Sequence, residues 1–255
     1  MPTTPETPKS STPLLRKKLE PAVRRARFDE QVKYIEARVG RNPTIPTERV
    51  RKRHFLTLLD LAASEEELRS VVNLVPKFKE AGGELIGTFA EEFARRCQEL
   101  QCQRLALHVF GNYIRYDIWL DIKAARWLLH SIYLNSPLDK VKVVIALYPL
   151  YKLPPFSEDL ASAAMVAAAC YKANTPEAIK VADALQPQIL SLLEKTQLST
   201  APDYATRKHN KWISWALQKV NRARKDKEPY VPWDRVPLKI RLQSPQPAAP
   251  QAATA

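Results

Sequence analysis

Glycine is scarce in this chain, which has 5 glycines and 21 prolines among 255 residues. Phosphate-binding loops need glycine because the backbone must approach the ligand closely. The scarcity therefore argues against a nucleotide-binding loop, and the sequence contains no GxGxxG, GxSxG or HExxH motif. Its 4 histidines lack metal-ligand spacing. We expect no enzymatic activity, no cofactor, no metal and no small-molecule substrate.

Cysteines and long apolar runs are also rare. The 3 cysteines, Cys97, Cys102 and Cys170, lie in apolar helical contexts, and we expect packed, reduced thiols rather than disulfides. No stretch approaches the ~18 apolar residues of a membrane span, so we expect no membrane contact. No segment alternates strictly between apolar and polar residues, which argues against half-buried strands.

Positive charge is concentrated at the two ends of the chain. The net charge is +13, with 14 basic and 7 acidic residues in 1–60 and 11 basic and 4 acidic residues in 201–242. The middle, 61–200, is about neutral, with 15 basic and 16 acidic residues. Basic ends attract polyanions, whose counterions are released on binding. The alternative is that they only confer solubility.

Helical periodicity fills the middle of the chain. A first helix is predicted from Thr47 to Ala63, and Ser64 with three following glutamates predicts a capping box that opens the second, which Gly82–Gly83 ends. Turn signals separate further helices at 84–99, 102–113, 121–134, 137–151, 157–173 and 176–195. The sequence therefore predicts an all-α fold of short antiparallel helix pairs.

The turns inside successive helix pairs recur at a nearly constant interval. They fall near Ser64, Gln101, Asn135 and Asn174, which are 37, 34 and 39 residues apart. Periods of this size are typical of helical-repeat solenoids, in which each pair buries its apolar face by stacking on its neighbours.

Two segments carry a family resemblance. Residues 165–185, MVAAACYKANTPEAIKVADAL, resemble a pentatricopeptide unit with a small-residue first helix, a CYKAN turn and a PEAIKVADAL second helix. Residues 125–155 resemble the same unit, including its final proline, and 91–110 fit more loosely. The resemblance covers 50–190 and implies a degenerate pentatricopeptide/TPR-like solenoid.

The resemblance also implies a function. Degenerate repeats with basic extensions are similar to small-subunit mitochondrial ribosomal proteins of the pentatricopeptide-like type, which implies a structural role in the mitochondrial matrix with ribosomal RNA and neighbouring ribosomal proteins as partners. An organellar pentatricopeptide RNA-binding factor in transcript processing or translation is one alternative. A protein-binding repeat adaptor or assembly factor is another.

Base reading by the repeats is not expected. Family members that read RNA use a short polar residue near the start of the first helix of each unit, and the matching positions here are Ala164, Ala125 and Glu91. Alanine cannot hydrogen-bond a base edge, and glutamate repels phosphate. The repeats are therefore predicted to serve as a scaffold that contacts proteins or fills space.

The segment 203–227 is predicted to be a basic amphipathic helix. Its apolar face is Trp212, Ile213, Ala216, Leu217 and Val220. A stripe beside it is predicted to contact RNA, with an exposed Trp215 for stacking on an unpaired base. The stripe and its basic extension are Lys208, Lys211, Trp215, Lys219, Arg222, Arg224 and Lys225. An ordinary amphipathic surface helix is the alternative.

The remaining predicted contacts lie in the two extensions. Residues 1–46 are assigned to a basic arm, of which 1–28 is either a cleaved presequence or a permanent RNA-binding arm. Residues 47–200 form the helical-repeat domain, 201–227 the basic helix and 228–255 a proline-rich extended tail. The tail residues predicted to bind a partner are Tyr230, Trp233 and Arg235. The N-terminal residues predicted to bind RNA are Arg16, Lys17, Lys18, Arg24, Arg25, Arg27, Arg51, Lys52 and Arg53.

Overall fold

The chain is all α-helical over residues 19–46, 49–196, 204–224 and 228–232, which the computed structural model describes, and no strand occurs among them. This confirms the predicted fold class. The helices are α1 (Pro21–Glu36), α2 (Lys52–Leu61), α3 (Glu65–Glu80), α4 (Phe89–Glu99), α5 (Gln103–Phe110), α6 (Tyr113–Tyr116), α7 (Ile122–Asn135), α8 (Leu138–Leu150), α9 (Leu160–Ala173), α10 (Pro176–Lys195) and α11 (Tyr204–Ala223). A 3-10 turn, η1 (Phe156–Glu158), precedes α9.

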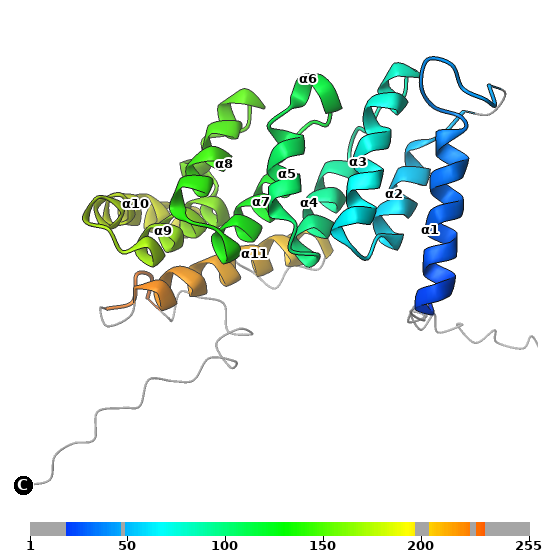
Figure 1. The fold of residues 1–255 in the computed structure, drawn as a ribbon. Helices are drawn as coiled ribbons and strands as arrows, with labels where there is room; N and C mark the ends of the chain where they lie inside the picture. The colour runs from blue at the N-terminus through cyan, green and yellow to red at the C-terminus, as the bar shows by residue number, and fades with distance from the viewer. Residues whose placement is uncertain (1–18, 47–48, 197–203, 225–227, 233–255) are drawn as a thin grey trace, which may run out of the picture.

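The helices pack in consecutive pairs. Helices α2, α4, α7 and α9 contact one another in that order, and each also packs against the helix that follows it in its pair, α3, α5, α8 or α10. Figure 1 shows the resulting row from α1 to α10, with α11 running back beneath it. Helix α11 packs along α9.

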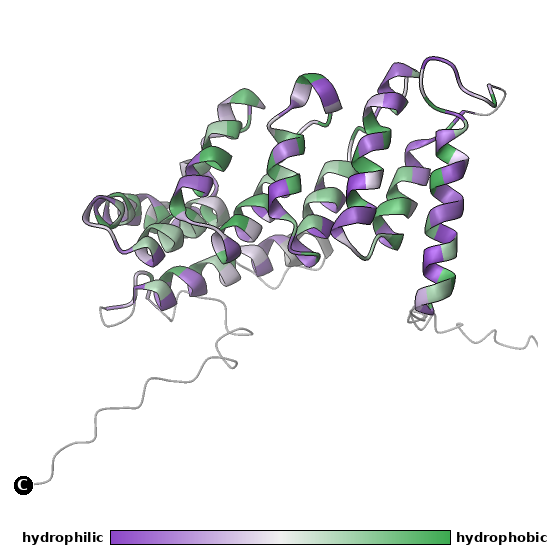
Figure 2. Ribbon diagram, in the orientation of Figure 1, coloured by the Kyte–Doolittle hydropathy of each residue, from purple (hydrophilic) through white to green (hydrophobic). Residues whose placement is uncertain are grey.

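Helix α9 forms the centre of the C-terminal half. All twelve of its residues from Leu160 to Tyr171 are buried, and half of them are alanine. Small side chains let neighbouring helix backbones approach closely, so α7, α8, α10 and α11 all contact this one helix. Helix α1, by contrast, is largely hydrophilic along its length (Figure 2).

Side-chain caps start several of the helices. The Glu67 N–H donates to Ser64 Oγ at 3.3 Å, which confirms Ser64 as the cap of α3. Asp121, Asp159 and Thr175 accept backbone N–H groups in the same way at the starts of α7, α9 and α10. Each cap satisfies a donor that the first helical turn leaves unpaired.

Helix α1 was not among the predicted helices, because residues 1–46 were assigned to an arm. It packs against α2 and α3 and buries Phe28 and Ile35. The apolar positions of this segment are few, so its helical period is weak in the sequence. Helix α2 is also shorter than predicted, since it begins at Lys52 rather than near Thr47.

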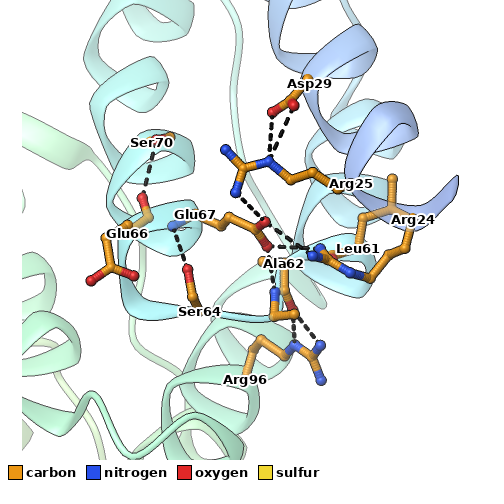
Figure 3. A network of polar contacts seen from close by, with 11 residues as sticks. Arg24, Arg25, Asp29, Leu61, Ala62, Ser64, Glu66, Glu67, Ser70 and Arg96 are labelled. Carbon is orange, nitrogen blue, oxygen red and sulfur yellow. Dashed lines mark hydrogen bonds and ion pairs between the residues drawn. The ribbon is translucent and has the colours of Figure 1, made fainter. Parts of the chain in front are cut away.

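A buried carboxylate fastens α1 to the helix row (Figure 3). The side chain of Glu67 is 4% exposed and accepts from Arg24 at 2.8 Å and from Arg25 at 3.0 Å. It also accepts the Ala63 N–H at 2.6 Å, and Arg24 donates further to the Leu61 carbonyl at 2.5 Å. Burial favours a higher pKa for Glu67, but the Arg24 and Ala63 hydrogen bonds outweigh it and lower the pKa.

A second buried ion pair links α7 to α9. Arg126 and Asp159 form a two-point pair, and their side chains are 10% and 11% exposed. Asp159 also accepts the Ser162 N–H at 3.0 Å, and Ser162 accepts the Tyr148 hydroxyl of α8 at 2.9 Å. Arg126 donates to Nδ1 of His209 on α11 at 3.0 Å. One network therefore connects α7, α8, α9 and α11.

Replacing Asp159→Asn leaves the Arg126 charge buried without its counter-ion. We expect the free energy of unfolding to fall by about 3–5 kcal/mol, measured by urea denaturation. Asp139→Asn is the matched control, because Asp139 pairs with Lys142 but its side chain is 83% exposed, and we expect a loss below about 1 kcal/mol. Equal losses in the two variants would contradict the role given to the pair.

Candidate nucleic-acid interface

The apolar face of α11 is buried against the helix row, as its periodicity predicted. Trp212 is half-buried, and its ring meets Trp127 of α7 edge to face, with 4.7 Å between centroids. The fully buried members of the face are Ile213, Ala216, Leu217 and Val220, each at most 1% exposed. Docking through this face leaves the opposite side of α11 turned away from the row.

The prediction of an exposed Trp215 is wrong. Its side chain is half-buried, and its ring lies edge-on to His130 of α7, with 4.1 Å between ring centroids. Its ring also packs edge to face against Trp212 at 5.8 Å. Helical periodicity identified the face that meets α9, but it could not show that α7 would cover a second side of the same helix. Trp215 is therefore part of the packing and is not a free platform for a base.

The aromatic junction between α7 and α11 encloses a histidine. Burial, followed by the nearby charge of Lys219, lowers the pKa of His130 to about 4. Its Nδ1 is buried and has no hydrogen-bond partner. The neutral imidazole is therefore the form that the folded protein accommodates at neutral pH.

Three cations from two helices gather beside this junction, and we call Lys172, Lys219 and Arg222 the basic cluster. Exposed Lys172 donates to the Tyr133 and Leu134 carbonyls at 2.8 and 3.0 Å, which holds its ammonium at the C-terminal end of α7. Lys219 lies 5.1 Å from the centroid of the Trp215 ring.

The basic cluster is a region of strong positive potential. Burial lowers the pKa of Lys219 first, and the charges of Arg222 and Lys172 lower it further. The charged groups that act on this ammonium are thus cationic, so a phosphate placed there would relieve repulsion as well as form ion pairs. Exposed Lys211 lies two turns earlier on α11 and extends the positive charge along the helix.

A groove continues from the same end of α7. It has a volume of about 560 Å³ and is lined in part by Asn135, Ser136 and Pro137, which directly follow the carbonyls that Lys172 binds. Exposed Arg104 of α5 and Lys140 of α8 stand on its walls. The groove can therefore hold an anionic group next to the basic cluster.

Sequence reasoning did not select Lys172, Arg104 or Lys140. Arg104 and Lys172 are each the single lysine or arginine of their helix, and Lys140 shares α8 with Lys142, so none belongs to a longer basic run. Only the packing of α5, α7, α8 and α9 brings them near the C-terminal end of α7. No local pattern contains that information.

The N-terminal predictions divide into two groups. Arg24 and Arg25 are engaged by Glu67, and Arg25 also by Asp29, so their charges are neutralised inside the chain. The Arg25 side chain nevertheless stays 59% exposed, so the RNA contact of these two residues stays a prediction. Lys52 donates to the Ile86 carbonyl at 2.8 Å. The other exposed cations of this group are Arg27, Arg51 and Arg53.

The described tail segment folds onto its own chain. The predicted partner contact of Tyr230 is wrong, because its side chain is fully buried and its hydroxyl donates to the Ala182 carbonyl at 2.6 Å. Asn221 binds both the N–H and the carbonyl of Val231 at 2.9 Å. Arg224 lies over the rings of Tyr171 and Tyr230, at 6.0 and 5.8 Å.

Several predicted residues lie outside the described part of the chain. They are Arg16, Lys17, Lys18, Lys225, Trp233, Arg235 and the side chain of Lys208.

The three positions that match base-reading residues are buried. Ala125 and Ala164 are fully buried, and Glu91 is 8% exposed. Side chains that line the contacts between helices are not presented to a ligand. The burial agrees with the expectation that these repeats do not read bases.

The described residues contain no group of three or more potential metal ligands, and no helix among them is long and apolar enough to cross a membrane. Cys97, Cys102 and Cys170 are free and buried, as predicted. No protein-family model matches this chain, and no curated protein matches it.

The pKa of His130 predicts how stability depends on pH. The unfolded histidine takes up a proton near pH 6.5, whereas the folded one resists until about pH 4. The free energy of unfolding therefore falls as the pH drops from about 6.5 to about 4. His130→Phe should reduce the dependence of this free energy on pH by at most about 1.4 kcal/mol per pH unit. Urea denaturation at several pH values measures it. Trp127→Phe alters the same junction without removing a titrating group and should keep the original slope.

Proposed function

We propose that this chain is a non-enzymatic helical scaffold of a ribonucleoprotein particle, namely a structural component of the small subunit of the mitochondrial ribosome. The observation that carries the proposal is the basic cluster, in which burial and then the charges of Arg222 and Lys172 lower the pKa of Lys219. A site that holds several cations close enough to repel one another is suited to an anion with several charges. The phosphate backbone of ribosomal RNA is such an anion.

The helix row supports the scaffold part of this proposal. We interpret the consecutive contacts of α2, α4, α7 and α9, each with its following helix, as a degenerate pentatricopeptide-like solenoid. Stacked pairs of this kind offer extended surfaces to neighbouring proteins. The pair turns fall at intervals of 37, 34 and 39 residues, which fits such a repeat.

The expected mode of RNA contact is electrostatic and independent of base sequence. Lysine and arginine position a protein on phosphate without reading bases. Half-buried Trp215, whose ring packs against His130, and buried Ala125 and Ala164 offer no base-edge contacts. This favours a particle component that is held through phosphate contacts and shape complementarity over a factor that recognises one transcript.

Removing the two lysines of the basic cluster together with Lys211 should weaken RNA binding. We expect the triple variant Lys172→Gln, Lys211→Gln, Lys219→Gln to bind a structured RNA hairpin more weakly, because each lost lysine removes one released counterion. The slope of log K against log salt concentration should become shallower by about 2 to 3. Fluorescence anisotropy over a salt series measures both quantities.

A matched variant controls for the loss of net charge. Lys33, Lys123 and Lys180 are exposed and lie on α1, α7 and α10, so changing all three to Gln removes the same charge elsewhere. This control should keep most of the affinity and slope. If both triple variants weaken binding equally, the contact is diffuse and the cluster is not the site.

The particle itself is tested by density-gradient sedimentation of a mitochondrial lysate. We expect the chain to co-migrate with the small ribosomal subunit at near one copy per particle, and to remain there when magnesium chelation separates the subunits. Migration near the top of the gradient would contradict the ribosomal proposal. A complex that survives ribonuclease and gives no RNA crosslink at α11 would instead identify a protein-binding adaptor.

A further inference from the structure

Exposed apolar side chains gather at the edge of the molecule opposite α11. Tyr113 and Ile114 of α6 are 37% and 90% exposed, Trp119 of the α6–α7 connection is 46% exposed, and Leu150 at the end of α8 is 61% exposed. We call these four residues the apical patch. Figure 1 shows α6 and the end of α8 at the top of the row, whereas α11 runs along its lower side. Figure 2 shows hydrophobic colour on these upper ends.

Two members of the patch, Tyr113 and Trp119, pack against the ring of one buried tyrosine, Tyr151. Rings of Tyr113 and Trp119 each lie 5.7 Å from the ring of Tyr151, edge to face, and 6.0 Å from each other. Leu150 is the neighbour of Tyr151 along the chain, and Ile114 is the neighbour of Tyr113. Clustered exposed aromatic and aliphatic side chains are a mark of interaction sites, unlike single exposed apolar residues.

The backbone beneath the patch is held in place. The Tyr151 hydroxyl donates to the Phe110 carbonyl at 2.6 Å, and Lys79 of α3 donates to the Ile114 carbonyl at 3.0 Å. These bonds tie α6 to α3, and they tie the residue that follows α8 to the end of α5. A surface that is already ordered loses little entropy when a partner binds.

The charges around the patch are mostly positive. Exposed Arg115 lies within α6, and exposed Lys152 follows Tyr151. The acids nearest in sequence are Asp117 and Asp121. Asp117 is paired with Lys79 at 3.5 Å and also interacts with the Tyr113 hydroxyl, whereas Asp121 caps α7. Arg115 and Lys152 thus leave the rim with a net positive charge, which complements acidic residues on a partner.

We propose that the apical patch docks an amphipathic helix of a neighbouring protein, with aliphatic residues on one face and flanking acidic residues. The aliphatic face covers Ile114, Trp119 and Leu150, and the carboxylates meet Arg115 and Lys152. The inference rests on the proposed scaffold role only in expecting a protein neighbour. It does not depend on the basic cluster, which lies at the other edge.

The test uses the full chain and two synthetic helical peptides that share one leucine face. One peptide has glutamates flanking that face, and the other has lysines at the same positions. We expect the acidic peptide to bind the original chain in fluorescence anisotropy. Ile114→Asp should lower the affinity for this peptide at least tenfold. The double variant Arg115→Gln, Lys152→Gln should lower both the affinity and its dependence on salt. Val181→Asp is the control, because Val181 of α10 is also 49% exposed and should bind normally.

Four results would overturn the proposal. Equal binding of the two peptides would show that the flanking charges do not matter. Undiminished peptide binding by Ile114→Asp would show that the patch does not matter. Self-association in analytical ultracentrifugation that Ile114→Asp abolishes would assign the patch to a second copy. Displacement of the peptide by an RNA hairpin would assign it to nucleic acid. The lysine triple variant should still bind the acidic peptide, which separates failure here from failure of the RNA proposal.

Discussion

The C-terminal half of the molecule depends on the buried pair of Arg126 and Asp159. An ion pair removed from water costs desolvation, and it is tolerated when further hydrogen bonds satisfy both partners. Asp159 meets this condition through Ser162 at the start of α9, and Arg126 through His209 on α11. Burial favours a higher pKa for Asp159, but the bond and charge of Arg126 outweigh it and lower the pKa. The pair therefore stays ionised and fixes the helices that it joins.

The position of α11 follows from that constraint and creates the basic cluster. His209 meets Arg126 near the start of α11, and the buried face from Ile213 to Val220 then follows α9. Because α11 lies along α9, Lys219 comes close to Lys172, a residue of α9 that is bonded to the end of α7. The cluster is thus a consequence of docking, and unfolding of α11 alone would disperse it.

Local signals in the sequence predicted the helices well, and non-local contacts explain what they could not predict. Ser64 and the turn at Asn174 marked helix boundaries because caps and left-handed turns depend on neighbouring residues. The fate of Arg24 depended on Glu67, which is 43 residues away in the chain. A run of basic residues has the same sequence pattern whether its partner is RNA or a buried carboxylate. Packing decides between the two, and it was invisible in the sequence.

The two proposed surfaces place different demands on the helix row. A phosphate contact tolerates small displacements, because charge attraction falls slowly with distance on the scale of the Debye length. An apolar contact loses up to about half of its dispersion energy across a gap of about 1 Å, so the apical patch must be held more firmly. The bonds from Lys79 and Tyr151 supply that rigidity. The cations of the basic cluster can hold phosphate over a wider range of distances. A scaffold that carries both surfaces can therefore keep a protein neighbour in register while its opposite edge adjusts to RNA.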